Sequence, residues 1–371
     1  MPTMTEQSTF NPDGPSRKDA GIYGLPHSVD EARVVVVPVP FEATVSYRAG
    51  TCHGPAAILS ASHQVDLFDA DVGRPYEPGI AMEDAPAWMV TKNAEARDAA
   101  TRVIAALEEG NDGDAADLAF VEAAGDAVNA HVNARVAALL KAGKIPVVVG
   151  GDHSVPFGAI TAVAEHLGST PLGVLHLDAH CDLRDAYEGF KWSHASIMKN
   201  VLDATSTVKL TQLGIRDFSD GELSVVKAQS SRVTTYFDVQ LRRARLSGGF
   251  LALAKQIAAT LPEHVYLSFD IDGLDPALCP STGTPVPGGL SFDEIVAVLH
   301  AVVDSGKRIV GLDLVEVAPP PEAIDGEGDD VEIGDSWDAN VGARLLYKMI
   351  GFALRSQGVG VDPALPTPPG V

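Results

Sequence analysis

Short runs of apolar, largely β-branched residues recur along the chain and alternate with longer amphipathic stretches. The runs are nearly continuous in hydrophobicity, as in strands buried on both faces of a parallel sheet. We predict strands at 33–39, 145–149, 172–177, 209–213, 265–269 and 309–315. Helices are predicted at 121–142, 155–166, 250–260, 292–303 and 341–354. Because alternating strands and helices are typical of βαβ units, the expected fold class is α/β, a three-layer αβα arrangement around a central, mostly parallel sheet.

The polar and Pro/Gly-rich segments set the expected domain limits. Residues 1–30 read as an irregular N-terminal arm, and 31–355 as one α/β domain. Residues 356–371 contain four prolines and are expected to be a disordered tail, because proline cannot continue a helix. The acidic segments 108–117 and 319–335 are predicted to be surface loops.

Composition narrows the class of protein. Of 371 residues, 46% are hydrophobic, which suits a sizeable core, but no apolar run approaches the roughly 20 residues of a membrane span. The formal net charge is −23 (27 basic minus 50 acidic residues), which disfavours nucleic acid and anionic membranes as partners. This charge supports a cationic substrate only weakly, since it also serves solubility. The N-terminus has no apolar signal segment and the three cysteines are scattered, so a cytoplasmic location is expected.

Polar clusters follow three of the predicted strands, where an ordinary sheet interior would be apolar. They read Gly-Gly-Asp-His-Ser at 150–154, Asp-Ala-His-Cys-Asp at 178–182 and Ser-Phe-Asp-Ile-Asp-Gly-Leu-Asp-Pro at 268–276. In open α/β sheets, ligands bind beyond the carboxyl ends of the strands. All three clusters can therefore meet in one crevice.

The acids and histidines in these clusters stand at alternate positions, which in an extended segment face the same side. The resulting ligand candidates are His153, Asp178, His180, Asp182, Asp270 and Asp272. Four carboxylates crowded together repel one another unless cations or protons neutralise them. Two divalent ions a few ångströms apart resolve this, and the oxygen–imidazole mixture suits Mn²⁺, with Ni²⁺, Co²⁺ or Zn²⁺ as alternatives. Cys181 lies on the alternate face and is expected to pack rather than bind metal, whereas His176 is a candidate for supporting the ligands.

With these motifs, the chain resembles the arginase/agmatinase ureohydrolases. The three clusters match that family's motifs, and so do Gly-Thr-Pro-Val-Pro-Gly-Gly at 283–289 and Asp-Leu-Val-Glu-Val-Ala-Pro at 313–319. Upstream, Arg-Ala-Gly-Thr at 48–51 and Gly-Pro-Ala-Ala-Ile at 54–58 also match. The resemblance spans about residues 33 to 355, and it implies an arginase-like fold and a homo-trimer or homo-hexamer, with 341–354 as a candidate interface.

The resemblance also implies a role for each site residue. One ion would be held by His153, Asp178, Asp182 and Asp270, and the other by His180, Asp178, Asp270 and Asp272. Glu316 would pair with the substrate guanidinium, whose parallel N–H donors fit a carboxylate. His194 would transfer protons, because an imidazole titrates near neutrality. A hydroxide activated by two metals would attack the guanidinium carbon, with Asp182 and Glu316 stabilising the tetrahedral intermediate, and urea would be released.

The substrate is less defined than the reaction. The loop at 183–193 departs from the arginase pattern and resembles agmatinases, so agmatine, giving putrescine, is the first expectation. Free guanidine is the alternative, because Tyr187, Phe190 and Trp192 can close a small pocket, with Trp192 contacting substrate. A guanidinobutyrate or a biguanide stays open. A distal ammonium would require a carboxylate, for which Asp185, Glu188 and the 322–332 loop are candidates.

Two readings from other classes compete with a hydrolase of this kind. A non-catalytic metal-binding subunit of a mixed oligomer would be expected to lack some site residues, but all are present. A binuclear phosphoesterase would need basic residues around the metals, and Arg184 is the only one beside the central motifs.

Overall fold

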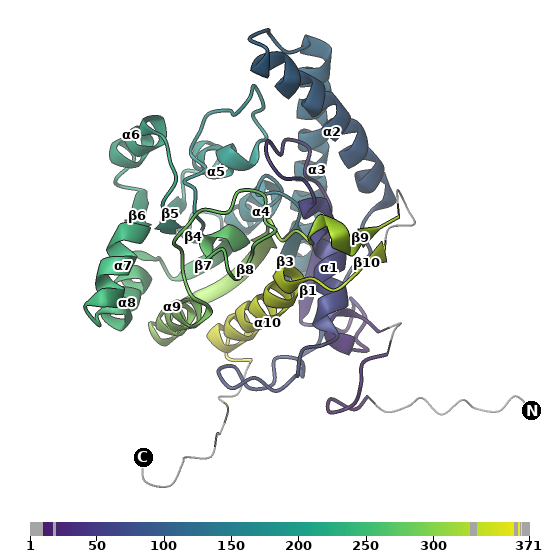
Figure 1. The fold of residues 1–371 in the computed structure, drawn as a ribbon. Coiled ribbons are helices and arrows are strands. Elements are labelled where there is room, and N and C mark those ends of the chain that lie inside the picture. The colour runs from purple at the N-terminus through teal and green to yellow at the C-terminus, as the bar shows by residue number, and fades with distance from the viewer. Residues whose placement is uncertain (1–9, 18–19, 327–331, 360–362, 364, 366–371) are drawn as a thin grey trace, which may run out of the picture.

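The computed structural model describes residues 10–17, 20–326, 332–359, 363 and 365. Its centre is an eight-stranded sheet in the order β2-β1-β3-β8-β7-β4-β5-β6, with every neighbouring pair parallel (Figure 1). The strands are β1 (Val34–Val39), β2 (Ile80–Met82), β3 (Ile145–Gly150), β4 (Leu172–Leu177), β5 (Val208–Ile215), β6 (Val233–Phe237), β7 (His264–Asp270) and β8 (Arg308–Val315). The expected αβα sheet is therefore confirmed.

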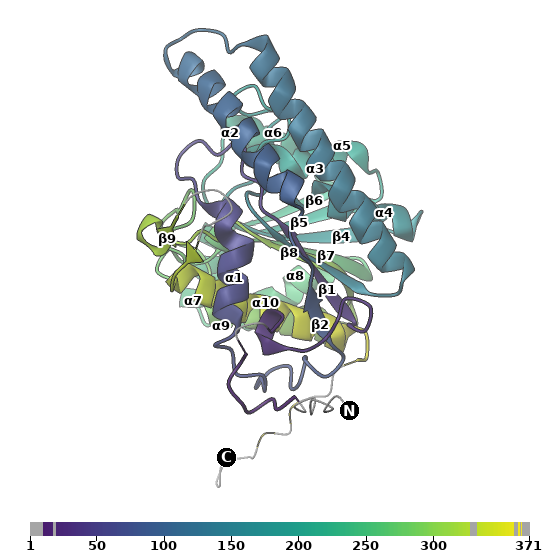
Figure 2. The ribbon, with the colours of Figure 1, turned by 90° about the vertical axis from the view of Figure 1, so that its right-hand side faces the viewer.

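Helices cover both faces of the sheet (Figures 1 and 2). One face is covered by α1 (Gly54–Ser62), α8 (Phe250–Thr260), α9 (Phe292–Asp304) and α10 (Trp337–Ser356). The other is covered by α2 (Ala87–Glu108), α3 (Ala115–Lys141), α4 (Phe157–Leu167) and α5 (Ile197–Ala204). The remaining helices, at the β5–β6 side, are α6 (Asp220–Ala228) and α7 (Asp238–Leu246).

Strand β1 shows why the apolar runs are continuous. Val34 and Val36 belong to the core on the α10 side, whereas Val35 and Val37 belong to the core on the α3 side. A strand with helices on both faces needs apolar residues at successive positions, not only at alternate ones. The predicted strands are all present, and each predicted helix overlaps an observed one.

Several elements depart from the sequence-based expectation. The segment 319–335 contains a short pairing of β9 (Ile324–Asp325) with β10 (Glu332–Ile333) instead of a plain loop. Helix α10, a candidate oligomer interface, contributes most of its 341–354 stretch to the core. Within the described part of the N-terminal arm, Tyr23 is buried and its hydroxyl donates to the Ala343 carbonyl over 3.0 Å. Much of the predicted tail, and residues 1–9, lie outside the described residues. No helix among the described residues is long and apolar enough to span a membrane.

Candidate metal centre and substrate pocket

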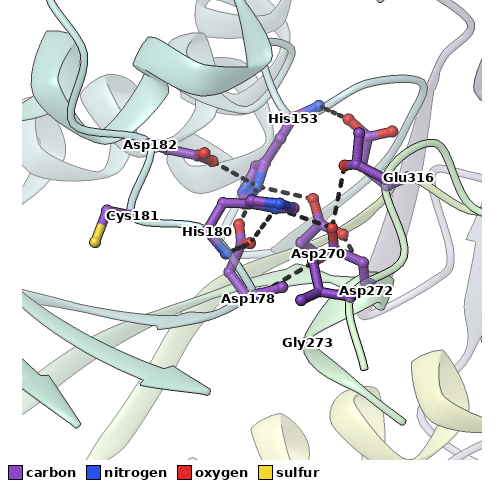
Figure 3. Close-up of polar contacts among 12 residues, drawn as sticks. His153, Asp178, His180, Cys181, Asp182, Asp270, Asp272, Gly273 and Glu316 are labelled. Carbon is purple, nitrogen blue, oxygen red and sulfur yellow. Dashed lines mark hydrogen bonds and ion pairs between the residues drawn. The ribbon is translucent and has the colours of Figure 1, made fainter. Parts of the chain in front are cut away.

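The candidate ligands, drawn in Figure 3, come from the carboxyl ends of three strands, β3, β7 and β4, and β8 lies between β3 and β7 in the sheet. His153 follows β3, Asp178 follows β4, and Asp270 is the last residue of β7. Asp272 lies in the 3₁₀ turn Ile271–Gly273 that continues β7. Because parallel strands end at the same edge, the fold brings these distant segments together, as the sequence predicts.

His153 is the centre of one half of the cluster. Its Nδ1 lies 3.0 Å from an oxygen of Asp178, 3.2 Å from Asp182 and 3.3 Å from Asp270. All of these side chains are buried. An imidazole surrounded by three carboxylates provides one nitrogen and several oxygens converging on a point, which is the donor set of a divalent transition ion.

The second half is built around His180. Its Nδ1 lies 3.1 Å from Asp272 and 3.4 Å from the second oxygen of Asp178. Asp178 thus offers one oxygen to each half and stands where a bridging carboxylate would lie. His176, Asp178 and Asp182 group with His153, and Asp178 and Asp272 group with His180, with potential ligand atoms within 4.8 Å in each group. The donor set fits two cations that share Asp178.

Hydrogen-bond chains behind the cluster hold its members in place. His153 Nε2 contacts the Ser268 hydroxyl at 3.0 Å, which donates to Asp313 over 3.2 Å. On the other side, His176 Nε2 lies 2.8 Å from Asp178, and the Gln212 amide donates to His176 Nδ1 over 3.1 Å. Since Gln212 donates to Nδ1, His176 carries its proton on Nε2 and donates to Asp178. These residues orient the ligands, as outer partners of metal sites do.

The backbone turns sharply at two of the candidate residues. Asp182 has φ 54° and Glu316 has φ 62°, a region that non-glycine residues rarely occupy. Strain of this kind persists only where the surrounding structure fixes it, and it is frequent at functional sites. The turn at Asp182 directs its carboxylate back toward His153, while Cys181 points away from the cluster (Figure 3).

Without cations, the carboxylates of the cluster do not all carry their usual charge. Burial and the charge of Asp178 raise the pKa of Asp182 to about 8. Burial and the charges of Asp272 and Asp178 raise the pKa of Asp270 well above its usual range. Burial opposes a charge on His180, but the facing carboxylates Asp272 and Asp178 raise its pKa to about 12. The cluster therefore compensates its excess negative charge with protons where ions would otherwise do so.

Glu316 lies beside this cluster, at the end of β8. Its Oε1 accepts from the His153 backbone amide over 2.9 Å, and its own amide donates to the Gly151 carbonyl over 2.8 Å. Burial and the charge of Asp152 raise its pKa well above the usual range. A buried carboxylate in this position favours a cationic partner, since a cation would restore its charged form.

His194 begins a 3₁₀ turn, His194–Ser196, in the loop between β4 and α5. It lines the pocket beside the metal cluster, and its Nδ1 is buried without a hydrogen-bond partner in the described structure. Burial and the charges of His180 and His153 lower its pKa to about 4. The imidazole is therefore neutral at pH 7, whereas an imidazole with the ordinary pKa is about one quarter charged at that pH.

Trp192 does not lie among the residues that line the pocket. Its indole nitrogen donates to Asp126 of α3 over 2.8 Å, and its ring packs against Phe157 with centroids 4.8 Å apart. Gly125 leaves the space that the ring fills, because a Cβ there would come within 2.7 Å of it. The structure gives Trp192 a packing role, and it does not support the prediction that this residue binds substrate.

A pocket of about 420 Å³ opens outward from the cluster. Beside the candidate metal centre it is lined by His180, Asp182 and His194, and its outer wall is formed by the exposed residues Tyr47, Arg48, Asp217 and Phe218. The rest of the lining is Ser46, Arg184, Tyr187, Ala195, Glu222, Thr284, Pro285 and Val286. Glu222 is already engaged, because its carboxylate accepts hydrogen bonds from the backbone amides of Ser219 and Leu183. Asp217 is exposed and adjoins His180 through a backbone bridge.

Of the candidate carboxylates for a distal ammonium, Asp185 and Glu188 lie outside the pocket. Asp185 is 89% exposed and pairs with Lys199 at 3.0 Å, and neither it nor Glu188 lines the pocket. Part of the 322–332 loop lies outside the described residues. Asp217 was missed, although it follows the predicted strand 209–213 and the strand-end rule applied to the other clusters would have identified it.

An αβα fold with paired carboxylate–imidazole groups at one sheet edge is the arrangement expected of a metal-dependent enzyme, and the comparisons with known proteins specify a hydrolase. The chain matches the sequence model of the Arginase family over residues 32–349, and it belongs to that family of ureohydrolases. It is 36% identical to an N(1)-aminopropylagmatine ureohydrolase of Thermus thermophilus over 293 residues, covering 78% of this chain and 84% of that protein. It is 31% identical to an agmatinase of Bacillus anthracis, covering 79% and 86%. The crystal structure of agmatine ureohydrolase of Thermoplasma volcanium shares the fold, with a TM-score of 0.65, 24% identity and coverage of 90% and 94%.

Proposed function

We propose that this ureohydrolase releases urea from agmatine or a closely related aminoalkylguanidine. The observation that supports this choice most directly is the outer wall of the pocket. It extends well beyond the space that a guanidinium needs, and it carries an exposed carboxylate, Asp217, beside aromatic rings. A cationic tail finds both a charge partner and aromatic faces there.

Free guanidine is less favoured than the sequence suggested. The small closed pocket required Tyr187, Phe190 and Trp192 to face the substrate. Phe190 is fully buried and Trp192 packs on α3, so only Tyr187 contributes to the wall. The pocket stays open toward solvent, which suits a substrate with a tail.

Each site residue takes part in a simple scheme. Two divalent ions, Mn²⁺ first and Ni²⁺ as the alternative, would be held by His153, Asp178, His180, Asp182, Asp270 and Asp272. When bound, such ions would supply a nucleophilic hydroxide and stabilise negative charge on the oxygen that it adds to the guanidinium carbon. Glu316 pairs with the guanidinium N–H groups and orients the carbon. Asp182 accepts the proton of the attacking oxygen and holds it close to the leaving nitrogen. His194 is neutral and carries an unpartnered ring nitrogen, so it relays protons between the pocket and solvent.

Location and assembly belong to the same proposal. Three scattered, unpaired cysteines support a reducing, cytoplasmic environment. The family resemblance supports a homo-trimer or homo-hexamer, which light scattering coupled to size-exclusion chromatography measures directly.

The decisive experiment measures urea release by enzyme loaded with Mn²⁺ or Ni²⁺. Agmatine, free guanidine, 4-guanidinobutyrate and arginine are compared side by side, with Asp270→Asn as the blank. We expect agmatine to have the highest kcat/KM. If only guanidine is turned over, the substrate proposal is wrong. If 4-guanidinobutyrate is preferred, Arg48 and Arg184 at the mouth, rather than Asp217, select the tail.

The role of Asp217 has its own prediction. Asp217→Asn removes the charge that we pair with the ammonium, so KM for agmatine should rise roughly tenfold, as expected for a partly exposed charge-assisted contact. The kcat for agmatine and all parameters for guanidine should stay unchanged. Asp220→Asn is the matched control, because Asp220 is exposed, three residues away, and does not line the pocket. Equal effects on agmatine and guanidine would remove Asp217 from tail recognition.

A further inference from the structure

A second pocket lies at the opposite edge of the sheet, where the central strands begin. Arg33 and Lys144 directly precede β1 and β3, and His264 and Arg308 are the first residues of β7 and β8. The register aligns these starts, since Val34 pairs with Ile145 and His264 pairs with Arg308. Four strands thus start at, or directly after, a basic residue at this edge of the sheet. The candidate metal centre lies at the opposite edge.

These residues line a pocket of about 400 Å³, together with His166 at the end of α4 and Gln357 just after α10. The lining includes no aspartate and no glutamate. Its remaining wall is mostly apolar, made of Leu140, Val163, Leu167 and Val310. In a chain with a net charge of −23, a pocket lined by basic groups and no acidic ones is a marked local exception.

Hydrogen bonds within the protein use only part of the donor capacity of these basic residues. Arg33 donates through Nη1 to the Gly143 carbonyl and through Nη2 to Gln357 over 3.0 Å. Lys144 donates to the carbonyls of Asp30 and Ala32 over 2.9 and 2.7 Å. Such contacts satisfy backbone carbonyls at loop and helix ends. A purely structural role of this kind is the simplest explanation for basic residues at this edge.

Donor capacity nevertheless remains on every cation. In the described structure, Arg33 Nε and His264 Nδ1 are buried without a hydrogen-bond partner. Arg308 makes one side-chain contact, to the same Gln357 oxygen over 3.2 Å. Among the described residues, no carboxylate lies within ion-pair distance of Arg33, Lys144 or Arg308. Buried donors without partners carry a free-energy cost that an acceptor would remove.

We propose that this pocket binds a small organic oxyanion, a carboxylate or phosphate joined to a short apolar group. The guanidinium and imidazole donors fit the oxyanion, because charged donors to an oxyanion form the stronger class of hydrogen bond. The aliphatic wall fits the apolar group, which distinguishes such a ligand from inorganic anions and from acetate. This site is separate from the catalytic pocket, and its occupancy does not depend on the proposed substrate.

The test follows the thermal midpoint of the metal-loaded enzyme during titration with isovalerate and with acetate, at constant ionic strength balanced with chloride. Stabilisation by a ligand rises with its concentration relative to its dissociation constant. We expect isovalerate to bind about tenfold more tightly than acetate, because its extra aliphatic carbons are buried. Arg308→Gln should weaken isovalerate binding about tenfold, and Arg308→Glu more strongly. Arg308 is exposed, so both variants should fold.

Arg242→Gln is the matched control, because it removes one exposed arginine of α7, away from the pocket, and changes the net charge equally. It should bind isovalerate as the unaltered enzyme does. Equal affinities for acetate and isovalerate would overturn the organic ligand. Equal losses in Arg308→Gln and Arg242→Gln would place the anion elsewhere, including at the metals, and would overturn the site itself.

Discussion

At the scale of single residues, the candidate metal centre contains more carboxylates than its imidazoles can neutralise. His153 contacts three carboxylates, and His180 contacts two. Asp178 keeps its charge despite burial, because the facing histidines 176, 153 and 180 lower its pKa well below the usual range. With a pKa of about 8, Asp182 then holds a proton at neutral pH in the metal-free protein, and the pKa of Asp270 is raised in the same direction. Binding of cations must displace the proton of Asp182.

This displacement predicts pH-dependent metal affinity. Below the pKa of about 8, metal-free Asp182 is protonated, so each cation competes with a proton. Affinity for Mn²⁺ should therefore rise as pH increases from about 6 to about 8, by up to about tenfold per pH unit for each proton displaced, and rise less steeply above that, where Asp182 is ionised but His180 still has a proton to lose. Competition with a fluorescent chelator measures it.

Two variants separate this effect from a general one. Asp182→Asn should bind Mn²⁺ more weakly and with a flatter pH dependence. Asp185→Asn removes a carboxylate from the same loop that is 89% exposed, and it should preserve the slope. A pH-independent affinity in the unaltered protein would show that Asp182 is ionised before metal binds.

The sequence predicts the members of the cluster correctly as neighbours, but it assumes the wrong local backbone for one segment. It assumed that residues 178–182 were extended, whereas β4 ends at Leu177 and Asp182 adopts φ 54°. Residue types at strand ends were therefore predictable, but the turn that aims Asp182 was not. The packing of Trp192 against Gly125 was also beyond prediction, because it depends on a contact between distant segments.

At the scale of elements, close packing between α3 and α4 supports the wall behind the site. Gly158 of α4 faces the α3 backbone, and a Cβ there would lie 2.3 Å from the Asn129 carbonyl oxygen and 2.8 Å from the Asn133 amide nitrogen. Backbone atoms cannot move aside as a flexible side chain can. Helix α4 follows the loop that carries His153, so its position bears on the candidate ligands.

We therefore expect Gly158→Ala to lower the free energy of unfolding by about 1–3 kcal/mol or more, despite the better helix propensity of alanine. Gly221→Ala is the control, because a Cβ at that helical position meets only the Ser219 hydroxyl at 3.7 Å. That variant should gain roughly 0.5–1 kcal/mol. Urea unfolding of both variants gives the values, and a neutral Gly158→Ala would mean that the two helices separate easily.

The elements that sequence reasoning missed have weak local signals. Strand β2 has three residues, Ile80–Met82, too few for a periodic pattern. Strand β6 is an edge strand whose Thr234 is exposed and Thr235 half-buried, so it lacks a continuous apolar run. By contrast, the central strands are buried on both faces, which makes their sequences unmistakable. In this protein, a strand is predictable from the sequence when both of its faces are buried.

At the scale of the whole molecule, the net charge of −23 creates a field that attracts cations. The opening of the pocket itself carries both acidic and basic residues, among them Asp217, Arg48 and Arg184. Agmatine carries two positive charges at neutral pH, whereas 4-guanidinobutyrate carries none overall. The kcat/KM for agmatine should fall severalfold when NaCl rises from about 20 mM to about 200 mM, because salt screens this attraction. Turnover of 4-guanidinobutyrate, where measurable, should change little. Parallel salt dependences would assign the effect to the enzyme's stability and not to steering.

The hydrogen bond between His153 and Glu316 joins positions that are 163 residues apart. A nascent chain emerges from the ribosome in order, so the candidate ligand set that begins after β3 is complete only once β4 and then β7 have been synthesised, and Glu316 is added with β8. An ion that arrives early meets only fragments of the site. If the proposed two-metal site forms, loading would therefore follow synthesis of the chain through β7, and the supply of free cation at that moment would bear on which ion is bound.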